Sequence, residues 1–156
     1  MIATKRDTIV DFLAQKRIAF VGVSRSASDF SRQLWAELKR RGYDLIPVNP
    51  DAAEIDGVPC SPAVAAIEPR PDGALLLVPP EVTERVVRDC AAAGIPRVWM
   101  YRAAGSGAVS EEAVRFCADH GISLVAGECP FMFLQGAGAV HTIHGWCRRI
   151  TGTYPH

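Results

Sequence analysis

The sequence has no long apolar run, no net charge and no closely paired cysteines, and each absence excludes a class of protein. No apolar stretch approaches the roughly 18 residues of a membrane span, and residues 1–7 lack the apolar centre of a signal peptide. Seventeen basic residues balance seventeen acidic ones, so no overall field attracts nucleic acid or an anionic membrane. Five cysteines are widely spaced without a C-x-x-C pair, which argues against a disulfide framework. We therefore expect a cytoplasmic protein that binds neither nucleic acid nor membrane.

The length of 156 residues predicts a single domain over 1–156, too small for a binding domain plus a full catalytic domain. Apolar residues at helical spacing predict an amino-terminal helix at about 4–15, and a carboxyl-terminal helical extension is predicted at about 137–151. Any activity therefore has to fit one site.

Apolar runs alternate with amphipathic segments along the rest of the chain. The predicted strands are 18–23, 44–48, 58–60, 74–78, 98–101 and 122–126, and the helices between them include 29–41, 80–93 and 110–120. Six such alternations without an internal repeat predict an α/β fold. The architecture we expect is a single doubly wound, Rossmann-like parallel sheet of about six strands in the order 3-2-1-4-5-6.

In that order a crevice opens between the carboxyl ends of strands one and four, where such folds bind ligands. Residues 22–28 form a glycine, serine and arginine turn before a helix, and free N–H groups and the dipole at a helix start favour an anion. Residues 48–50 and 78–80 border the crevice and end in proline, which offers a rigid apolar face without an N–H donor. These two segments suit the flat ring of a nucleotide base.

NAD is the obvious nucleotide, and two positions argue against it. The G-x-G-x-x-G fingerprint is reduced to Gly22-x-Ser24-x-x-Ala27, which lacks the second glycine. The second strand ends in Val48-Asn49, where an acidic residue would hold the ribose. A small NAD(P)-dependent oxidoreductase is therefore the alternative interpretation.

Several motifs together resemble a known family over roughly residues 15–130. They are Ile18-Ala19-Phe20-Val21-Gly22-Val23-Ser24-Arg25 with Phe30 behind it, Ile46-Pro47-Val48-Asn49-Pro50, Glu54-Ile55-x-Gly57, Val78-Pro79-Pro80, Val98-Trp99-Met100 and Glu128-Cys129-Pro130. In these the chain resembles the CoA-binding domains of the succinyl-CoA ligase α-subunit type, in their small stand-alone form.

The resemblance implies a domain that holds the ADP part of coenzyme A or of an acyl-CoA, with the serine-arginine turn facing the phosphates. Arg25 and Arg32 would carry the phosphate contacts, with a solvated helix face as the alternative for Arg32. The full set of expected binding residues is Gly22, Val23, Ser24, Arg25, Ser28, Phe30, Arg32, Val48, Asn49, Pro50, Val78, Pro79 and Pro80. The ligases use a phosphohistidine in a second domain, so we expect a binding or sensing module without a catalytic residue.

Other conspicuous residues carry weaker hypotheses. His141, His144 and Cys147 are three residues apart, which is strained for a metal site, so we expect a packing helix and no metal. Cys129 is either a buried thiol or one that meets the thiol of the ligand. Trp99 and Tyr101 either cover the pantetheine arm or close the core. The acyl group stays open, as does whether a second copy or another protein is the partner.

Overall fold

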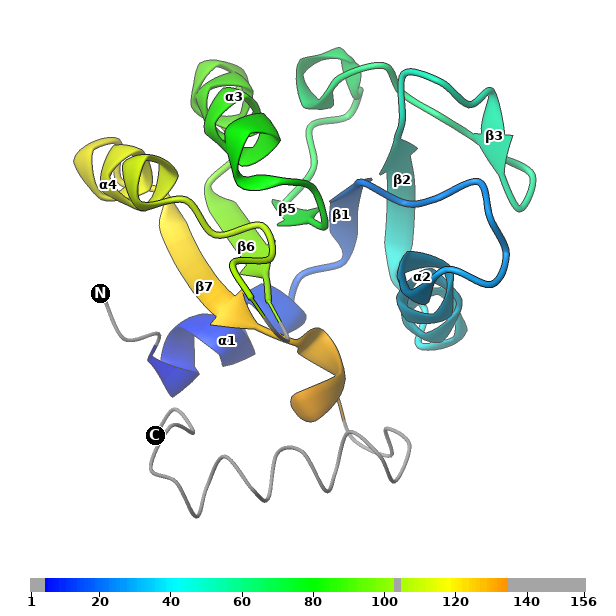
Figure 1. Cartoon of the computed structure of the whole chain (residues 1–156), viewed down its shortest axis with the longest axis horizontal. Helices are drawn as coiled ribbons and strands as arrows, with labels where there is room; N and C mark the ends of the chain where they lie inside the picture. Colours follow the sequence, from blue (N-terminus) through cyan, green and yellow to red (C-terminus); the bar gives the residue numbers. More distant parts are fainter. Residues whose placement is uncertain (1–4, 103–104, 135–156) are drawn as a thin grey trace.

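The computed structural model describes residues 5–102 and 105–134 as a parallel sheet with helices on both faces (Figure 1). The strands of the sheet are β1 (Arg17–Val21), β2 (Asp44–Val48), β5 (Gly73–Leu76), β6 (Arg97–Tyr101) and β7 (Ser123–Glu128). Their order is β2-β1-β5-β6-β7, and all four neighbouring pairs are parallel. The predicted α/β class is confirmed, as is the relative order of these five strands.

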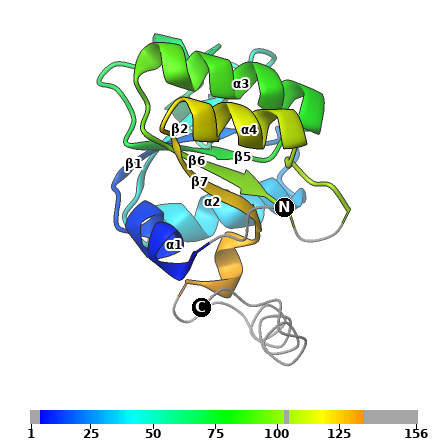
Figure 2. The same ribbon diagram turned by 90° about the vertical axis from the view of Figure 1, so that its left-hand side faces the viewer.

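The helices form two layers around the sheet. Helices α1 (Arg6–Leu13) and α2 (Phe30–Arg40) cover one face, whereas α3 (Pro80–Ala93) and α4 (Glu111–Asp119) cover the other (Figure 2). Because successive strand side chains point to opposite faces, each strand contributes to both cores. A sheet buried on both faces explains why the strands are continuous apolar runs rather than alternating patterns.

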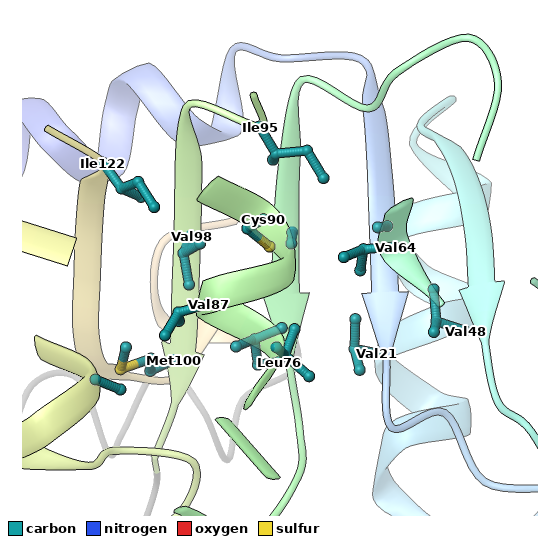
Figure 3. Close-up of a cluster of buried hydrophobic side chains, with 14 of the residues drawn as sticks. Val21, Val48, Val64, Leu76, Val87, Cys90, Ile95, Val98, Met100 and Ile122 are labelled. Carbon is teal, nitrogen blue, oxygen red and sulfur yellow. The ribbon is translucent and has the colours of Figure 1, made fainter. Parts of the chain in front are cut away.

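The core under α3 is made mainly of aliphatic side chains (Figure 3). Val87 and Cys90 of α3 are fully buried against Leu76 and Val98 of the neighbouring strands. Burial raises the pKa of the Cys90 thiol to about 12, so this cysteine packs as a small apolar side chain. This core fixes the end of β5, and with it the start of α3.

The predicted third strand is the main error in the fold. Residues Val58–Pro59 form β4, which pairs with β3 (Glu54–Ile55) in a separate antiparallel hairpin. Directly after the hairpin, an isolated parallel bridge pairs Ser61 with Val48 of β2. Proline cannot donate to a ladder, and Asp-Gly favours a tight hairpin turn, so Asp56 and Gly57 direct the chain into local pairing. The sheet therefore has five strands rather than six.

The predicted ends of the chain have different outcomes. The amino-terminal helix is present as α1, somewhat shorter than the predicted 4–15. Its Phe12 lies edge-on to Trp99, with ring centroids 5.3 Å apart. The predicted helix at 137–151, with His141, His144 and Cys147, lies outside the described residues.

Candidate functional site

Two turns touch where β1 and β5 end. Gly22 follows β1 with φ +97°, and a Cβ at this position would lie 2.2 Å from the carbonyl oxygen of Leu77. The Leu77 N–H donates to the Val21 carbonyl at 2.8 Å, which holds the two turns together. Only glycine allows both the positive φ and this close approach. Gly22 therefore lets the β1–α2 turn lie directly against the β5–α3 turn.

A groove of about 500 Å³ opens over this contact, at the switch point of the sheet. Three turns line it, those that follow β1, β5 and β6. The lining residues are Gly22, Ser24, Asp29, Phe30, Ser31, Leu77, Val78, Pro79, Tyr101, Gly107 and Ala108. Five of the expected binding residues are among them: Gly22, Ser24, Phe30, Val78 and Pro79.

The β1–α2 turn is held by its own serine side chains. The Ser24 N–H donates to Ser31 Oγ at 2.9 Å, and the Ser26 N–H donates to Ser24 Oγ at 3.0 Å. The hydroxyls of Ser26 and Ser28 lie 3.1 Å apart, and both residues are exposed. These short side-chain bonds replace the ladder bonds that the backbone loses on leaving β1.

Helix α2 begins with a carboxylate of the chain itself. Asp29 is the N-cap, and its Oδ1 accepts hydrogen bonds from the Ser31 hydroxyl at 2.6 Å and the Ser31 N–H at 2.8 Å. These two donors lower the pKa of Asp29 below its usual value of 3.8. The sequence interpretation overlooked this cap, although an Asp directly before a helix is its signature. An anion in the groove therefore lies beside a fixed negative charge.

The donors left in the turn lie outside its hydrogen-bond network. The backbone N–H groups of Arg25, Ala27 and Ser28 donate to no atom of the described residues. The Arg25 side chain is exposed and forms no ion pair with another residue of the described ranges. This part of the turn offers one guanidinium and three N–H groups to an anion.

Arg32 is placed differently from Arg25. Its side chain is only 13% exposed, which contradicts the alternative of a solvated helix face. Its Nη1 donates to the carbonyls of Ser24 and Arg25, at 3.3 Å and 3.2 Å, and its Nη2 pairs with Asp56 at 2.5 Å. The guanidinium is thus bonded to the back of the turn and to the β3–β4 hairpin.

The expected residues at the end of β2 and just after it lie beside the groove and are not among its lining residues. Val48 is buried, and its carbonyl accepts the Gly22 N–H at 3.4 Å. Asn49 Nδ2 donates to the carbonyl of buried Val23 at 3.2 Å, so its amide ties the two turns together. Pro50 is exposed beyond them. These residues brace the turn after β1.

The β5–α3 turn supplies the apolar wall. Val78 and Pro79 line the groove, and Pro80 is the first residue of α3. Pro79 stands at the N-cap without a side-chain cap, and Pro80 has no N–H to cap. This wall therefore contributes apolar surface rather than polar contacts.

The third wall is aromatic and comes from the end of β6. Tyr101 packs against Phe30 of α2, with ring centroids 5.3 Å apart, and both residues line the groove. Burial raises the pKa of Tyr101 to about 12, so its phenol stays neutral at pH 7. Gly107 and Ala108 complete the wall because the loop folds back, with the Ala108 N–H donating to the Tyr101 carbonyl at 2.7 Å. The sequence interpretation missed these two residues.

Trp99 in the middle of β6 and Cys129 directly after β7 are both buried. Trp99 is 0% exposed and donates its indole N–H to the Glu128 carbonyl at 2.9 Å, which places it in the core. Cys129 is 1% exposed at the end of β7. Burial of this kind hinders thiol exchange, so the hypothesis that Cys129 reacts with a ligand thiol requires the site to open.

The described residues contain neither a metal-binding cluster nor a membrane-spanning helix. No group of three or more His, Cys, Asp and Glu side chains in residues 5–102 and 105–134 is arranged to hold a metal ion. No helix in these ranges is long and apolar enough to cross a membrane.

Comparison with known proteins gives the relatives of this chain. A segment of 87 residues is 31% identical to the ADP-forming acetate–CoA ligase II of Archaeoglobus fulgidus, which covers 54% of this chain and 13% of the ligase. The ADP-forming acetate–CoA ligase of Methanocaldococcus jannaschii is 29% identical over 80 residues, or 51% of this chain and 11% of the ligase. This chain therefore spans only a small part of the length of these ligases.

Solved structures of two sizes share the fold. A hypothetical protein from Pyrococcus horikoshii OT3 is 28% identical, with 81% of this chain and 87% of that chain covered and a TM-score of 0.74. The dinucleotide forming acetyl-coenzyme A synthetase 1 of Ca. Korarchaeum cryptofilum is 26% identical, with 76% and 27% covered and a TM-score of 0.65. The family model described as CoA binding domain matches residues 16–135. The chain belongs to the CoA binding domain family.

Proposed function

We propose that this chain binds coenzyme A or an acyl-CoA in the groove at the carboxyl edge of the sheet, as a non-catalytic binding or sensing module. The observation that carries the proposal is the pairing of an anion-binding turn with an apolar wall across one groove, in a chain of the CoA binding domain family. Both halves of an adenosine diphosphate moiety find a matching surface there.

In this proposal the two sides of the groove take different parts of the ligand. The phosphates lie against the exposed turn, where Arg25 and the N–H groups of Ala27 and Ser28 are available. The adenosine lies against Val78 and Pro79. The pantetheine arm follows the aromatic wall at Tyr101. Val48, Asn49 and Pro50 support the turn from the β2 side.

The affinity arithmetic favours a ligand longer than a mononucleotide. Burying about 120 Å² of an adenine contributes roughly 3 kcal/mol, at about 25 cal/mol per Å². A phosphate at the turn adds about 1–2 kcal/mol. Micromolar affinity needs about 8 kcal/mol, so further contacts along an extended arm are required. Coenzyme A supplies such an arm.

The chemistry of the groove supports binding rather than catalysis. Its two titratable lining residues are Asp29, whose pKa is lowered, and Tyr101, whose pKa is raised to about 12. An efficient general acid or base has a pKa near the working pH, and neither residue does. If purified protein turned over an acyl-CoA at a rate abolished by Arg25→Ala, the non-catalytic role would be wrong.

Thermal unfolding with separate ligands tests the proposal. We would add CoA, acetyl-CoA, dephospho-CoA and NAD at millimolar concentration, because a ligand at a hundred times its Kd stabilises by about 2.7 kcal/mol. We expect a rise in Tm with CoA that is smaller with dephospho-CoA and absent with NAD. A rise with NAD alone would reject CoA binding and support the oxidoreductase. Acetyl-CoA compared with CoA shows whether the acyl group adds contacts.

The cellular setting belongs to the same proposal. Reduced thiols fit the spacing of the five cysteines and a cytoplasmic location. A sensing or delivery role would also need a protein partner or a second copy of the chain. Light scattering with and without CoA would reveal a dimer.

A further inference from the structure

Arg32 makes a set of contacts that the binding proposal does not use. Three protein oxygens surround its guanidinium: the carbonyls of Ser24 and Arg25 and the Asp56 carboxylate. The side chain is 13% exposed. Arginine matches several acceptors at fixed angles, so these bonds orient it strongly. These acceptors take both N–H groups of Nη1 and one of Nη2, and the side chain is largely buried, so little of this guanidinium is left to contact a phosphate.

The two carbonyls determine where the neighbouring N–H groups point. The carbonyl and N–H of a trans peptide point in opposite directions. Because Arg32 draws the Ser24 carbonyl toward itself, the N–H of Arg25 points away from Arg32. The Arg25 carbonyl is fixed in the same way, and the next N–H, that of Ser26, is taken up by Ser24 Oγ. Arg32 therefore holds repulsive carbonyl oxygens behind the turn and leaves a donor on its outer side.

Asp56 connects this arrangement to a distant part of the chain. It sits in the tight turn of the β3–β4 hairpin with φ +48°, and its side chain is 54% exposed. The hairpin lies beside the β1–α2 turn (Figure 1), and the Arg32–Asp56 ion pair joins the two. Glu54 lies on the same hairpin, and its side chain forms no hydrogen bond or ion pair with another residue of the described ranges.

We propose that Arg32 is a positioning residue: paired with Asp56, it fixes the β1–α2 turn so that the Arg25 N–H faces the ligand phosphates, without touching those phosphates itself. This rests on the proposed function, because it assumes that an anionic ligand occupies the turn. It also replaces the expectation that Arg32 carries phosphate charge. The β3–β4 hairpin then anchors the binding turn through the Arg32–Asp56 ion pair, at a place where the sequence predicted a strand of the sheet.

The direction in which Asp56→Asn changes CoA affinity separates a positioning role of Arg32 from direct phosphate contact. Asp56→Asn weakens the hold on Arg32. If Arg32 positions the turn, we expect CoA affinity to fall by about three- to tenfold. If Arg32 instead contacts phosphate, releasing it from Asp56 raises CoA affinity. Glu54→Gln is the matched control, because it removes the same charge from the same hairpin without touching Arg32. Isothermal titration calorimetry measures the CoA affinity of the wild type and of both variants.

The dependence of CoA binding on ionic strength distinguishes a residue that contacts phosphate from one that only supports the turn. Salt screens a direct contact between an exposed guanidinium and a phosphate. We expect Arg25→Ala to weaken CoA binding and to reduce its dependence on ionic strength. Asp56→Asn should weaken binding and leave that dependence as in the wild type. An affinity for Asp56→Asn that equals or exceeds that of Glu54→Gln would overturn the proposal.

Hydrogen exchange keeps this inference separate from CoA binding itself. In protein without ligand, Asp56→Asn should speed exchange of the two hydrogen-bonded amides of the turn, those of Ser24 and Ser26, relative to Glu54→Gln, because the turn loses its anchor. Unchanged exchange would overturn the positioning role whether or not CoA binds. A wild-type protein that shows no CoA binding would instead overturn the proposed function. The exchange result would still show whether the Arg32–Asp56 pair anchors the β1–α2 turn.

Discussion

Two helices begin at the same groove, and their first turns are built in opposite ways. Helix α2 starts with the Asp29 carboxylate, which accepts two hydrogen bonds from Ser31. Helix α3 starts at Pro79 and Pro80 and has no side-chain cap. One helix start is polar and carries a negative charge, whereas the other is rigid and apolar.

This difference separates the two tasks of the groove. The α3 start presents a surface for a flat, uncharged group and needs no solvent to satisfy a proline nitrogen. The α2 start satisfies its own N–H with Asp29, so in the proposed complex the phosphates would bind further out, at Arg25 and the free N–H groups before the helix. A helix start is therefore an anion site only where the chain has not supplied its own carboxylate.

The largest effect is expected from separating the two helix starts. Gly22→Ala would place a Cβ 2.2 Å from the Leu77 carbonyl oxygen and 2.8 Å from Val78 Cγ1, at a φ of +97°. We expect a loss of about 3 kcal/mol or more in unfolding free energy, because backbone strain and a backbone clash combine. Urea unfolding measures this loss, and CoA binding should disappear with it.

Gly121→Ala is the control for backbone strain. Gly121 has φ +68°, and a Cβ there would meet no atom within 4 Å. Its substitution should cost only about 1–2 kcal/mol. Equal losses of unfolding free energy in Gly22→Ala and Gly121→Ala would show that the positive φ accounts for the whole effect and that the close contact between the turns adds nothing.

Removing the acidic cap tests the polar helix start. Asp29→Ala should lower the unfolding free energy by about 1 kcal/mol, whereas Asp29→Asn, which keeps a capping oxygen, should lose much less. Asp29→Asn also removes a negative charge from the groove, so we expect tighter CoA binding by calorimetry. Weaker binding in this variant would mean that the carboxylate contacts the ligand favourably.

The pH dependence of stability gives a smaller test of the same cap. The folded-state pKa of Asp29 lies below 3.8, so its stabilisation is present above pH 3.8 and is lost as the pH falls through the folded-state pKa. The stability difference between wild type and Asp29→Asn should therefore shrink below pH 3.8. Glu37, whose pKa Arg40 and Arg41 lower to about 2, titrates in both proteins and cancels in the difference. A difference that stays constant down to pH 2 would contradict the hydrogen-bonded cap.

The sequence was sufficient for most of the fold because the parallel strands are apolar on both faces. Runs such as Ile18–Val21 can be placed only inside a covered sheet. The error at Val58–Pro59 has a local cause, since an Asp56-Gly57 turn brings β3 against β4 before the chain can reach the sheet.

The candidate site was only partly predictable because one of its walls depends on tertiary folding. The glycine, serine and proline residues at the strand ends carry local signals, and Gly22, Val78 and Pro79 do line the groove. Ala108 reaches the groove because its N–H donates to the Tyr101 carbonyl. Arg32 turns inward because it pairs with Asp56, which is 24 residues further along the chain. No spacing in the sequence encodes such a pairing.

The smallest effect is expected from giving the apolar helix start a cap. Pro79→Ser supplies a hydroxyl that can accept an N–H of the first turn of α3, a gain of about 0.5–1 kcal/mol. Losing the proline releases unfolded-chain entropy and costs about 0.4–1 kcal/mol, so the net change in unfolding free energy should be near zero. Pro62→Ser, at an exposed proline that is not itself an N-cap, should show the cost alone. The difference between the two variants, measured by urea unfolding, therefore isolates the cap. If Pro79→Ser were as destabilised as Pro62→Ser, the start of α3 would have no free N–H for a cap to satisfy, and its contrast with α2 would be one of shape alone.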